Sequence, residues 1–474
     1  MTKPKALLWF RNDLRLGDNP ALYAACESGF DLLCVYIHDV EDKAIRPRGA
    51  ASLWRLDKAL RALKTDLARL GGELHLVRGS AEALLPELAE ASAAAKIVWN
   101  RRYGSGEIAQ DKRLKAKLRE AGREVESFNG ALLMEPWEIA PKSGGAFKVF
   151  SPFWRAFQTR FSPHTPLPAP KQARFGAWPA KGPARLSIDQ LGLLPTRPDW
   201  AATFKQDVGG EAAAVHELSN FLDERLEDYA IMRDRLDQSG TSHLSAALHF
   251  GEISPRQVYV AAAGRKGADK FLSELGWREF SKHLLFANPD LATRDFNARF
   301  KTFPWGHDEN ALKSWQSGRT GYPVVDAGMR QLWRTGTMHN RARMITASFL
   351  TKHLLIDWRE GEEWFWDTLV DADLANNTAS WQWVAGCGAD AAPYFRIFNP
   401  VLQGEKFDPE GAYVRRYCPE LKGMPNKYIH KPWTAPASVL AEANLRLGVD
   451  YPKPMVEHDF ARRRALEAFA SLTA

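Results

Sequence analysis

Cysteine is scarce in this chain, and the few cysteines are scattered. Among 474 residues only Cys26, Cys34, Cys387 and Cys418 carry a thiol, and no two of them form a CxxC pair. The scattered positions support neither a disulfide framework nor a zinc site. Scattered free thiols fit a reducing compartment, so we expect a cytoplasmic protein without a bound metal.

Long apolar runs and the glycine fingerprint of nicotinamide enzymes are also absent. No stretch reaches the roughly 18 uncharged apolar residues that a membrane span needs, so we expect no membrane partner. The start, MTKPKALLWFRNDLR, has a short apolar run followed at once by charges, which is typical of a first strand and not of a signal peptide. The loop that follows, RNDLRLGDNP, contains no GxGxxG, which argues against a conventional dinucleotide site there.

Positive charge and tryptophan are both abundant. The formal net charge is +7, and the isoelectric point is near 9.1. A basic balance suits a polyanionic partner such as nucleic acid, although many basic proteins have no such partner. Nine of the 17 tryptophans lie between Trp277 and Trp383. Core packing, base stacking and electron transfer are all consistent with this concentration.

Residues 1–130 alternate short β-type runs with amphipathic segments. The runs that read as strands lie at 5–10, 31–38, 73–79, 96–102 and 124–130. Helical patterns separate them, near 19–29, 50–70, 81–92 and 106–121. This alternation predicts an α/β domain with a doubly wound, Rossmann-like parallel sheet, in which ligands bind at the carboxyl ends of the strands.

The rest of the chain divides into a linker and a helical domain. Residues 131–210 are rich in proline, glycine and alanine, and we expect a long surface linker that holds no regular helix. From Glu211 the pattern is helical almost throughout. The expected organisation is therefore an α/β domain at 1–130, a linker at 131–210 and an all-α domain at 211–474.

Two clusters in the helical domain carry polar groups that composition does not explain. The run Thr241–Ser245 stands at a predicted helix start, where hydroxyl groups cap the helix and backbone N–H groups favour an anion. Glu274, Trp277 and Arg278 share a helix face through i,i+3 and i,i+4 spacing, which suits either salt-bridge packing or a binding site.

Two further clusters follow. Asn340 and Met344 share one helix face. This face is either surface charge around a core methionine or part of a binding site. The segment DADLANN, residues 371–377, places two acids and two amides in seven residues, which would be costly to bury without partners. Trp381 and Trp383 come next, and because two helical residues turn through about 200°, they should face nearly opposite ways.

Taken together and in order, these blocks resemble those of the DNA photolyase/cryptochrome family. The blocks that carry the resemblance are WFRNDLRLGDNPAL, ELGWREF, TGYPVVDAGMRQL, MHNRARMITASFL, DADLANN, WQWVAGCGADAAPYFRIFNP and QGEKFDPEGAYVRRY. The resemblance covers nearly the whole chain and is weakest at 131–210. It implies that the helical domain binds FAD non-covalently, and it points to a class I or class III enzyme that acts on cyclobutane pyrimidine dimers.

The resemblance implies a set of FAD contacts. Matching positions near the phosphates are Tyr229, Thr241, Ser242, His243, Leu244, Ser245 and Arg278, and those on the ribityl and isoalloxazine side are Arg343, Asp371, Ala372 and Asp373. Arg343 would pair with Asp371. Asn377 matches the position beside the flavin N5, where repair enzymes typically carry Asn and plant photoreceptor cryptochromes carry Asp.

The resemblance also implies a reaction. Photoexcited, fully reduced FAD would pass an electron to a dimer flipped out of the duplex, a step for which photolyases are a standard example. The positions that contact the pyrimidine dimer in the family correspond to Glu274, Trp277, Asn340, Met344 and Trp383. The positions that contact the DNA backbone or lesion correspond to Arg233, Arg341 and Gln403. Glu274 and Asn340 would hydrogen-bond the base edges. The MHNR pattern at His339 is that of dimer enzymes, whereas (6-4) photolyases place a histidine pair at this pocket.

Electron supply and light harvesting involve other positions. Trp381, Trp358 and Trp305 match the family's tryptophan chain that re-reduces oxidised flavin, with core packing as the alternative, and Trp333 and Trp366 are candidates for a second route.

The antenna is left open. Glu107 matches a contact to methenyltetrahydrofolate, but Gly106 stands where folate-binding members have a polar side chain. A folate, a deazaflavin and no antenna therefore remain alternatives.

Two rival functions remain. A cryptochrome-type photoreceptor is disfavoured by Asn377, by the matching pocket residues and by the lack of a long tail after about residue 465. A non-catalytic DNA-binding module would not need the DADLANN segment. We therefore expect a monomeric enzyme that acts on dimer-containing double-stranded DNA.

Overall fold

The computed structural model describes residues 4–142, 144–204, 208–391 and 395–472. These residues fall into two compact units. The first comprises Met1–Trp200, Gln206–Glu227 and Ser242–Pro289, and the second Ala201–Lys205, Asp228–Thr241 and Asp290–Ala474. The division by role at residues 130 and 210 stays a prediction, and residues 392–394 of the WQW block lie outside the described residues.

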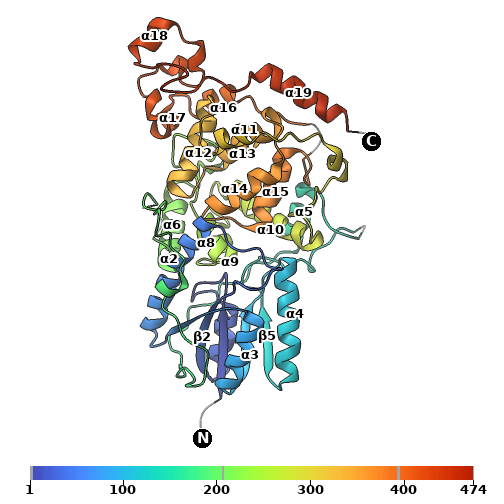
Figure 1. The fold of residues 1–474 in the computed structure, drawn as a ribbon. Helices are drawn as coiled ribbons and strands as arrows, with labels where there is room; N and C mark the ends of the chain where they lie inside the picture. The colour runs from blue at the N-terminus through green and yellow to red at the C-terminus, as the bar shows by residue number, and fades with distance from the viewer. Residues whose placement is uncertain (1–3, 143, 205–207, 392–394, 473–474) are drawn as a thin grey trace. The chain divides into compact units, whose positions relative to one another are not determined.

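A parallel five-stranded sheet forms the centre of the first unit (Figure 1). Its strands are β1 (Lys5–Phe10), β2 (Asp31–His38), β3 (Leu74–Arg78), β4 (Ala94–Asn100) and β5 (Glu124–Phe128). Their order is β3-β2-β1-β4-β5 and all neighbours are parallel. The predicted doubly wound topology is thus confirmed, with the switch of strand order between β1 and β4.

Apolar cores cover both faces of this sheet. In β1, Ala6, Leu8 and Phe10 belong to one buried cluster, whereas Leu7 and Trp9 belong to the other. Side chains of a strand alternate between faces, so a strand buried on both sides reads as a continuous apolar run. This explains why the central runs at 5–10 and 31–38 could be recognised as strands in the sequence.

The first unit also contains α-helices of 6 to 20 residues. They are α1 (Pro20–Glu27), α2 (Ala50–Arg69), α3 (Ala81–Ala91), α4 (Ser105–Glu120), α5 (Phe150–Arg160), α6 (Glu211–Glu224), α8 (Ser245–Phe250), α9 (Pro255–Ala262) and α10 (Ala268–Ala287). Asn19 caps α1 by accepting from the Leu22 backbone N–H. Ser254 and Gln257 form a capping box at α9. Such caps satisfy N–H groups that the first helical turn leaves without partners.

The segment 131–210 differs from the expected linker. It contains α5, and the side chains of Phe150, Phe153 and Phe157 along this helix are buried. The expectation of no regular helix was therefore wrong, because aromatic residues at helical spacing provide a face to bury, which outweighs the local proline and glycine content. The proline-rich part from 161 to 186 does lack helix.

The second unit is helical. Its helices are α7 (Tyr229–Met232), α11 (Glu309–Gln316), α12 (Pro323–Thr335), α13 (Asn340–Ser348), α14 (Trp358–Thr368), α15 (Leu374–Ala385), α16 (Pro400–Phe407), α17 (Ala412–Tyr417), α18 (Ala437–Glu442) and α19 (His458–Ala470). A π-helical turn, Phe349–His353, extends α13. No helix in the described ranges is long and apolar enough to cross a membrane.

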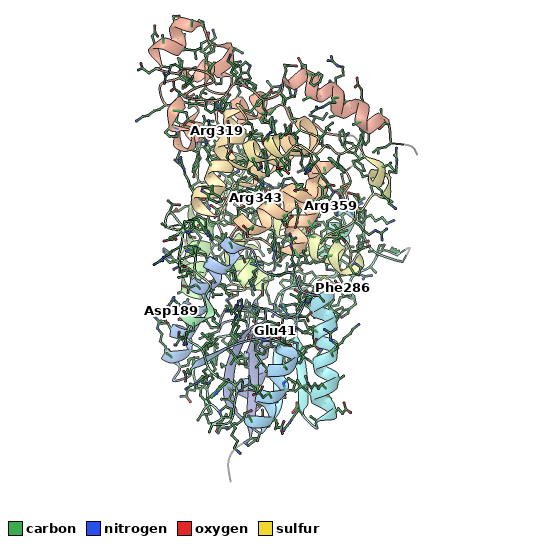
Figure 2. All side chains as sticks on the ribbon, in the orientation of Figure 1. Glu41, Asp189, Phe286, Arg319, Arg343 and Arg359 are labelled. Carbon is green, nitrogen blue, oxygen red and sulfur yellow. The ribbon has the colours of Figure 1, made fainter. Side chains whose placement is uncertain are left out.

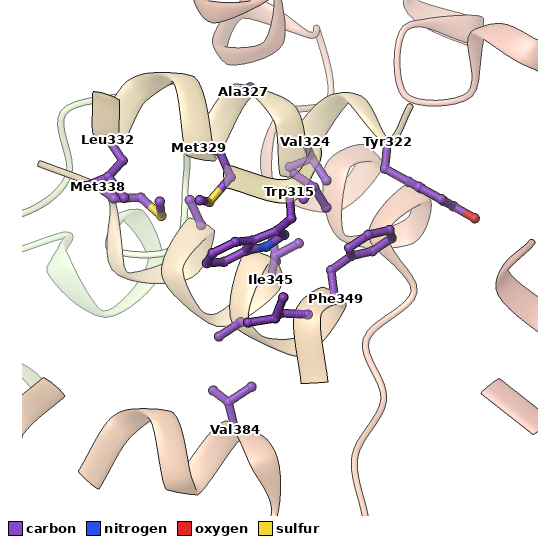
Figure 3. Packing of buried hydrophobic residues seen from close by; sticks show 14 of the residues in the cluster. Trp315, Tyr322, Val324, Ala327, Met329, Leu332, Met338, Ile345, Phe349 and Val384 are labelled. Carbon is purple, nitrogen blue, oxygen red and sulfur yellow. The ribbon is translucent and has the colours of Figure 1, made fainter. Parts of the chain in front are cut away.

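The core of the second unit is built around tryptophan. Trp315 lies between α12 and α13, close to Met329, Ile345 and Phe349 (Figure 3). Its indole N–H donates to the Thr346 carbonyl at 2.9 Å. Several of the clustered tryptophans therefore pack in the core, among them Trp315, Trp358 and Trp381.

Candidate active site

The start of α15 brings together the acids and amides of the DADLANN segment. Arg343 donates from Nη2 to both Asp371 oxygens, at 3.0 and 2.9 Å, and from Nε to the Met338 carbonyl. The expected pairing of Arg343 with Asp371 is thus present, and Figure 2 locates Arg343 among the helices of the second unit. Asp373 caps α15 by accepting from the Asn376 backbone N–H at 3.0 Å. Charge pairing and capping explain how this polar segment is accommodated.

Asn377 is held by a buried carboxylate from α14. Its Nδ2 donates to the backbone carbonyl of Glu362 at 2.9 Å and to Glu362 Oε1 at 2.8 Å. Glu362 is 3% exposed and Asn377 is 9% exposed. Because both amide hydrogens are engaged, the orientation of the amide is fixed and Oδ1 is the atom left to accept a hydrogen bond.

Glu362 is a site residue that sequence reasoning missed. It stands in the run Gly361-Glu362-Glu363, and only its partner distinguishes it from the exposed Glu363. Its one sequence signal is its position four residues after Trp358, on the same helix face.

Asn340 and Met344 lie on one face of α13, as their spacing predicts. Asn340 is exposed, and its Nδ2 lies 3.8 Å from the Met344 sulfur. His339 caps the helix, because its Nδ1 accepts from the Arg341 backbone N–H at 3.1 Å. A hydrogen-bonding amide therefore stands beside an adaptable apolar thioether.

The predicted DNA contacts of the second unit form a small network. Arg341 pairs with Asp234 at 2.7 Å, and its guanidinium lies 4.4 Å from the centroid of the Phe407 ring. Arg233 lies 3.9 Å from Asp234. Gln403 Oε1 is buried and finds no hydrogen-bond partner among the described residues. A buried acceptor without a partner is costly, which is typical of a position that a ligand or water completes.

Tyr229 is buried in α7, and the Arg233 guanidinium lies 5.6 Å from its ring centroid. Thr241 is the last residue of the segment Asp228–Thr241, which belongs to the second unit and contains α7. Ala372 is buried between Asp371 and Asp373. Their predicted contacts with FAD stay predictions.

In the first unit, the run Ser242–Ser245 leads into α8. The helix begins at Ser245, and Leu244 at the capping position makes no side-chain hydrogen bond to its first turn. The expected hydroxyl cap was therefore wrong, since Leu244 occupies the capping position. His243 has a positive φ of 53°, and burial lowers the pKa of its imidazole, which keeps the ring neutral at neutral pH.

The predicted α10 residues are held by separate contacts within the first unit. Glu274 pairs with Lys270 at 2.7 Å. Trp277 stacks on Phe150, with ring centroids 4.0 Å apart and planes 9° apart. Arg278 donates to the Ala131 carbonyl at 3.0 Å and to Glu279 at 3.0 Å. α5, which the sequence did not predict, thus supports the Trp277 ring.

Glu279 is another charged group that sequence reasoning missed. It is fully buried and accepts from the Leu133 backbone N–H at 2.8 Å. Burial raises the pKa of its carboxyl group to about 7, against the opposing charge of Arg278. Its contacts fix the loop that follows β5.

The tryptophans after the DADLANN segment face different surroundings, as predicted. Trp381 is 2% exposed and packs edge-on against Phe365, with centroids 4.9 Å apart. Trp383 is only partly buried, and its N–H donates to the Asp390 carbonyl.

The other candidate electron carriers differ in exposure. Trp358 is fully buried, whereas Trp333 is 53% exposed. Trp333 stacks on Trp364 with an interplanar angle of 7°. The indole N–H of Trp305 is buried and has no hydrogen-bond partner among the described residues. The predicted roles of Trp305, Trp333 and Trp366 are not tested by these contacts.

Gly106, at the predicted antenna position, has a steric reason to be glycine. A Cβ there would collide with the backbone carbonyl of Ala44, and a Cβ at Gly104 would collide with the Glu107 carboxylate. A polar side chain at position 106 would therefore need the chain around Ala44 to move. Glu107 lies in the first turn of α4, and its role stays a prediction.

The donor set around α15 suits a flavin. The fixed Asn377 leaves a neutral acceptor oxygen, which would accept from an N–H group of a bound flavin. The Arg343–Asp371 pair adds a cation and an anion, with the Asp371 side chain 5% exposed. The residues present are thus compatible with FAD, with Asn377, Arg343, Asp371 and Asp373 as its candidate holders in this unit.

Known proteins match this chain over its whole length. Residues 6–171 match a family profile described as DNA photolyase, and residues 271–471 match the FAD binding domain of DNA photolyase. A deoxyribodipyrimidine photo-lyase of Agrobacterium fabrum is 50% identical over 473 residues, which cover 98% of both chains. Cryptochrome-2 of Arabidopsis thaliana is 38% identical, over 98% of this chain and 79% of that protein.

A solved structure agrees with these matches. A bacterial class III photolyase from Agrobacterium tumefaciens superposes with a TM-score of 0.95 at 49% identity, covering 100% of this chain and 98% of that chain. With both family profiles matched and 50% identity to a full-length photo-lyase, the chain belongs to the DNA photolyase/cryptochrome family.

Proposed function

We propose that this protein is a deoxyribodipyrimidine photo-lyase that uses light and reduced FAD to split cyclobutane pyrimidine dimers in DNA. The full-length relative that is 50% identical carries this name, and the similar solved structure is a class III photolyase. Bound FAD would supply the photoexcited electron, and the protein orients it and excludes competing reactions.

The Asn377–Glu362 contact carries the proposal. A carboxylate at 2.8 Å holds the amide so that its oxygen remains as an acceptor. That arrangement favours the reduced flavin, which has a hydrogen at N5, over the oxidised flavin, which does not. Reduced flavin is the form that can donate an electron to a dimer, so this arrangement is compatible with repair.

Residues of the second unit are suited to hold a flipped dimer. Asn340 offers an amide to base edges, and Met344 and Trp383 offer apolar surface to the dimer, which has lost its aromatic stacking. Arg341 and Arg233 supply positive charge for phosphates. In the first unit, Glu274 and Trp277 are the corresponding predicted contacts.

This proposal requires damaged DNA as the partner. We further propose that the protein binds double-stranded DNA as a monomer. Methenyltetrahydrofolate at Glu107, a deazaflavin and no antenna remain the alternatives for light harvesting. Mass spectrometry of chromophores released from the purified protein distinguishes these three.

The test uses the purified holoprotein and two lesions. The protein is reduced and illuminated with blue light together with oligonucleotides that carry either a cyclobutane dimer or a (6-4) product, and dark samples are the control. We expect flavin absorbance and light-dependent repair of the dimer alone. Repair of only the (6-4) product would overturn the proposal. Flavin absorbance without any repair would favour the cryptochrome alternative.

A further inference from the structure

Trp358 combines full burial with a charged hydrogen-bond acceptor. It is 0% exposed, and its Nε1–H donates to Asp295 Oδ1 at 2.8 Å. The Asp295 side chain is 8% exposed, so solvent screens this carboxylate poorly. The acceptor varies among the buried indoles, since Trp315 donates to a backbone carbonyl and Trp99 of the first unit donates to the Asp111 carboxylate, so the role of Asp295 depends on the charges around the Trp358 ring and on its place beside Trp381.

The surrounding charges are arranged around the Trp358 ring. The Arg359 guanidinium lies over the ring, 4.6 Å from its centroid, and Figure 2 locates this arginine. Arg359 contacts Asp295 at 3.2 Å and Asp357 at 3.1 Å. Two carboxylates and one guanidinium leave one formal negative charge in excess beside the indole. That excess favours a positive charge on the ring.

The segment that carries Asp295 is fixed by a side chain from α15. Gln382 donates from Nε2 to the carbonyls of Leu291 at 2.7 Å and Arg294 at 2.8 Å. It accepts from the Phe296 backbone N–H at 2.8 Å. Gln382 is fully buried. Asp295 is therefore held by the residue that follows Trp381 in the chain.

Trp381 and Trp358 are brought together by the packing of α14 and α15. A Cβ at Gly361 would collide with the Trp381 ring, so glycine allows this indole to approach the backbone of α14 one turn from Trp358. Asn377 lies four residues before Trp381, on the same face of α15. The sequence Asn377, Trp381, Trp358 thus leads away from the proposed flavin position through buried groups.

We propose that Asp295 is a positioning residue that makes Trp358 a better electron donor, because its carboxylate stabilises the positive charge that Trp358 acquires when it gives an electron to Trp381. This inference rests on the proposed function, in which oxidised flavin is re-reduced through these tryptophans. The inference assigns to Asp295, a residue outside the tryptophan chain, a part in setting the direction of electron transfer.

After Trp381 has given one electron to the photoexcited, oxidised flavin, one electron passes from Trp358 to Trp381. Trp381 returns to its neutral form and Trp358 carries the positive charge. Its Nε1 proton stays in the hydrogen bond to Asp295, and no covalent bond forms or breaks. Trp305 is the next donor, and a thiol in solution is the final reductant.

Three variants separate this role from loop support. Asp295→Asn keeps the size and a hydrogen-bond acceptor but removes the charge, and we expect the rate of flavin photoreduction under blue light with thiol to fall at least tenfold. Asp357→Asn is the graded control, because it removes a carboxylate from the same arginine without touching the indole, and we expect a clearly smaller fall in the photoreduction rate than in Asp295→Asn. Arg359→Gln removes the cation over the ring and should raise the long-lived radical yield.

The direction in which each variant changes photoreduction distinguishes an electrostatic role of Asp295 from a structural one. A purely structural role predicts that Asp295→Asn and Arg359→Gln both lower photoreduction, since both loosen the same segment, and that result would overturn the inference. Equal rates in wild type and Asp295→Asn would overturn it as well. Flavin content and melting temperature are measured for each variant to exclude unfolding.

A readout without light checks the hydrogen bond itself. In nitrogen-15-labelled protein, the Trp358 indole N–H resonance, assigned through Trp358→Phe, should move upfield in Asp295→Asn and stay in place in Asp357→Asn. An unmoved resonance in Asp295→Asn contradicts the inference.

The proposed function fails separately from this inference. A wild type that repairs dimers when reduced beforehand but cannot be photoreduced overturns the role of Asp295 and leaves repair standing. Normal photoreduction with the expected response in Asp295→Asn, but no repair, supports Asp295 and overturns repair.

Discussion

Replacing Asn377 by Asp tests the most specific contact of the site. The substitution keeps the shape of the side chain and places a second carboxylate where an amide now donates to Glu362 at 2.8 Å. Two like charges about 4 Å apart repel by about 4 kcal/mol at the effective dielectric constant of about 20 that suits protein sites. One of the two carboxyl groups should therefore hold a proton in the folded variant at neutral pH.

The sign of the pH dependence follows from that proton. The folded variant binds more protons than the unfolded chain, so the free energy of unfolding falls as pH rises, by about 1.4 kcal/mol per pH unit while the extra proton is held. We expect Asn377→Asp to resemble wild type near pH 5 and to be about 4 kcal/mol less stable near pH 8. That loss corresponds to a melting temperature roughly 8–16 °C lower for a unit of about 200 residues.

Melting curves of the holoprotein at both pH values measure the effect, and a double variant provides the control. Asn377→Asp combined with Glu362→Gln removes the repulsion and should restore both stability and its flat pH profile. If Asn377→Asp destabilises the protein equally at both pH values, or if Glu362→Gln does not rescue it, the reasoning about this buried pair is refuted.

Three further outcomes are expected. Burial raises the pKa of Glu279 to about 7, so its contribution to the free energy of unfolding should be lost as pH rises from about 4.5 to 7. In urea unfolding, Glu279→Gln should remove roughly 3 kcal/mol of this pH dependence. An unchanged pH profile of stability contradicts the assigned burial. Trp381→Phe should slow photoreduction at least tenfold while enzyme reduced beforehand repairs normally, and loss of that repair would refute a role limited to electron supply. Arg341→Gln should weaken binding to dimer-containing DNA and lower the slope of log affinity against log salt by about 1; an unchanged slope removes Arg341 from the phosphate contacts.

The fold was largely predictable because its signals are local. The central strand β1 is a largely apolar run that ends at Phe10, where the charged RND run begins. The edge strand β5, EVESF, instead alternates buried and exposed residues. The α5 helix was missed because proline and glycine counted over residues 131–210 concealed three phenylalanines at helical spacing. A composition measured over a long window averages out such a short amphipathic face.

The site was predictable only where the chain itself brings residues together or where resemblance identifies them. Arg343 and Asp371 were paired through the resemblance. Glu362 was not found, because its contact with Asn377 depends on how α14 packs against α15. Asp295 was missed for the same reason, since it lies in a segment without regular structure and meets Trp358 only after folding.

A single-flash experiment tests the central claim most directly. The protein is fully reduced, mixed with excess oligonucleotide that contains one thymine dimer, and given one short blue flash in the absence of any external reductant. We predict recovery of intact thymines in a fraction of the complexes, with the flavin returned to its reduced state so that a second flash repairs more. A flavin that is left oxidised with no thymine recovered would contradict the account.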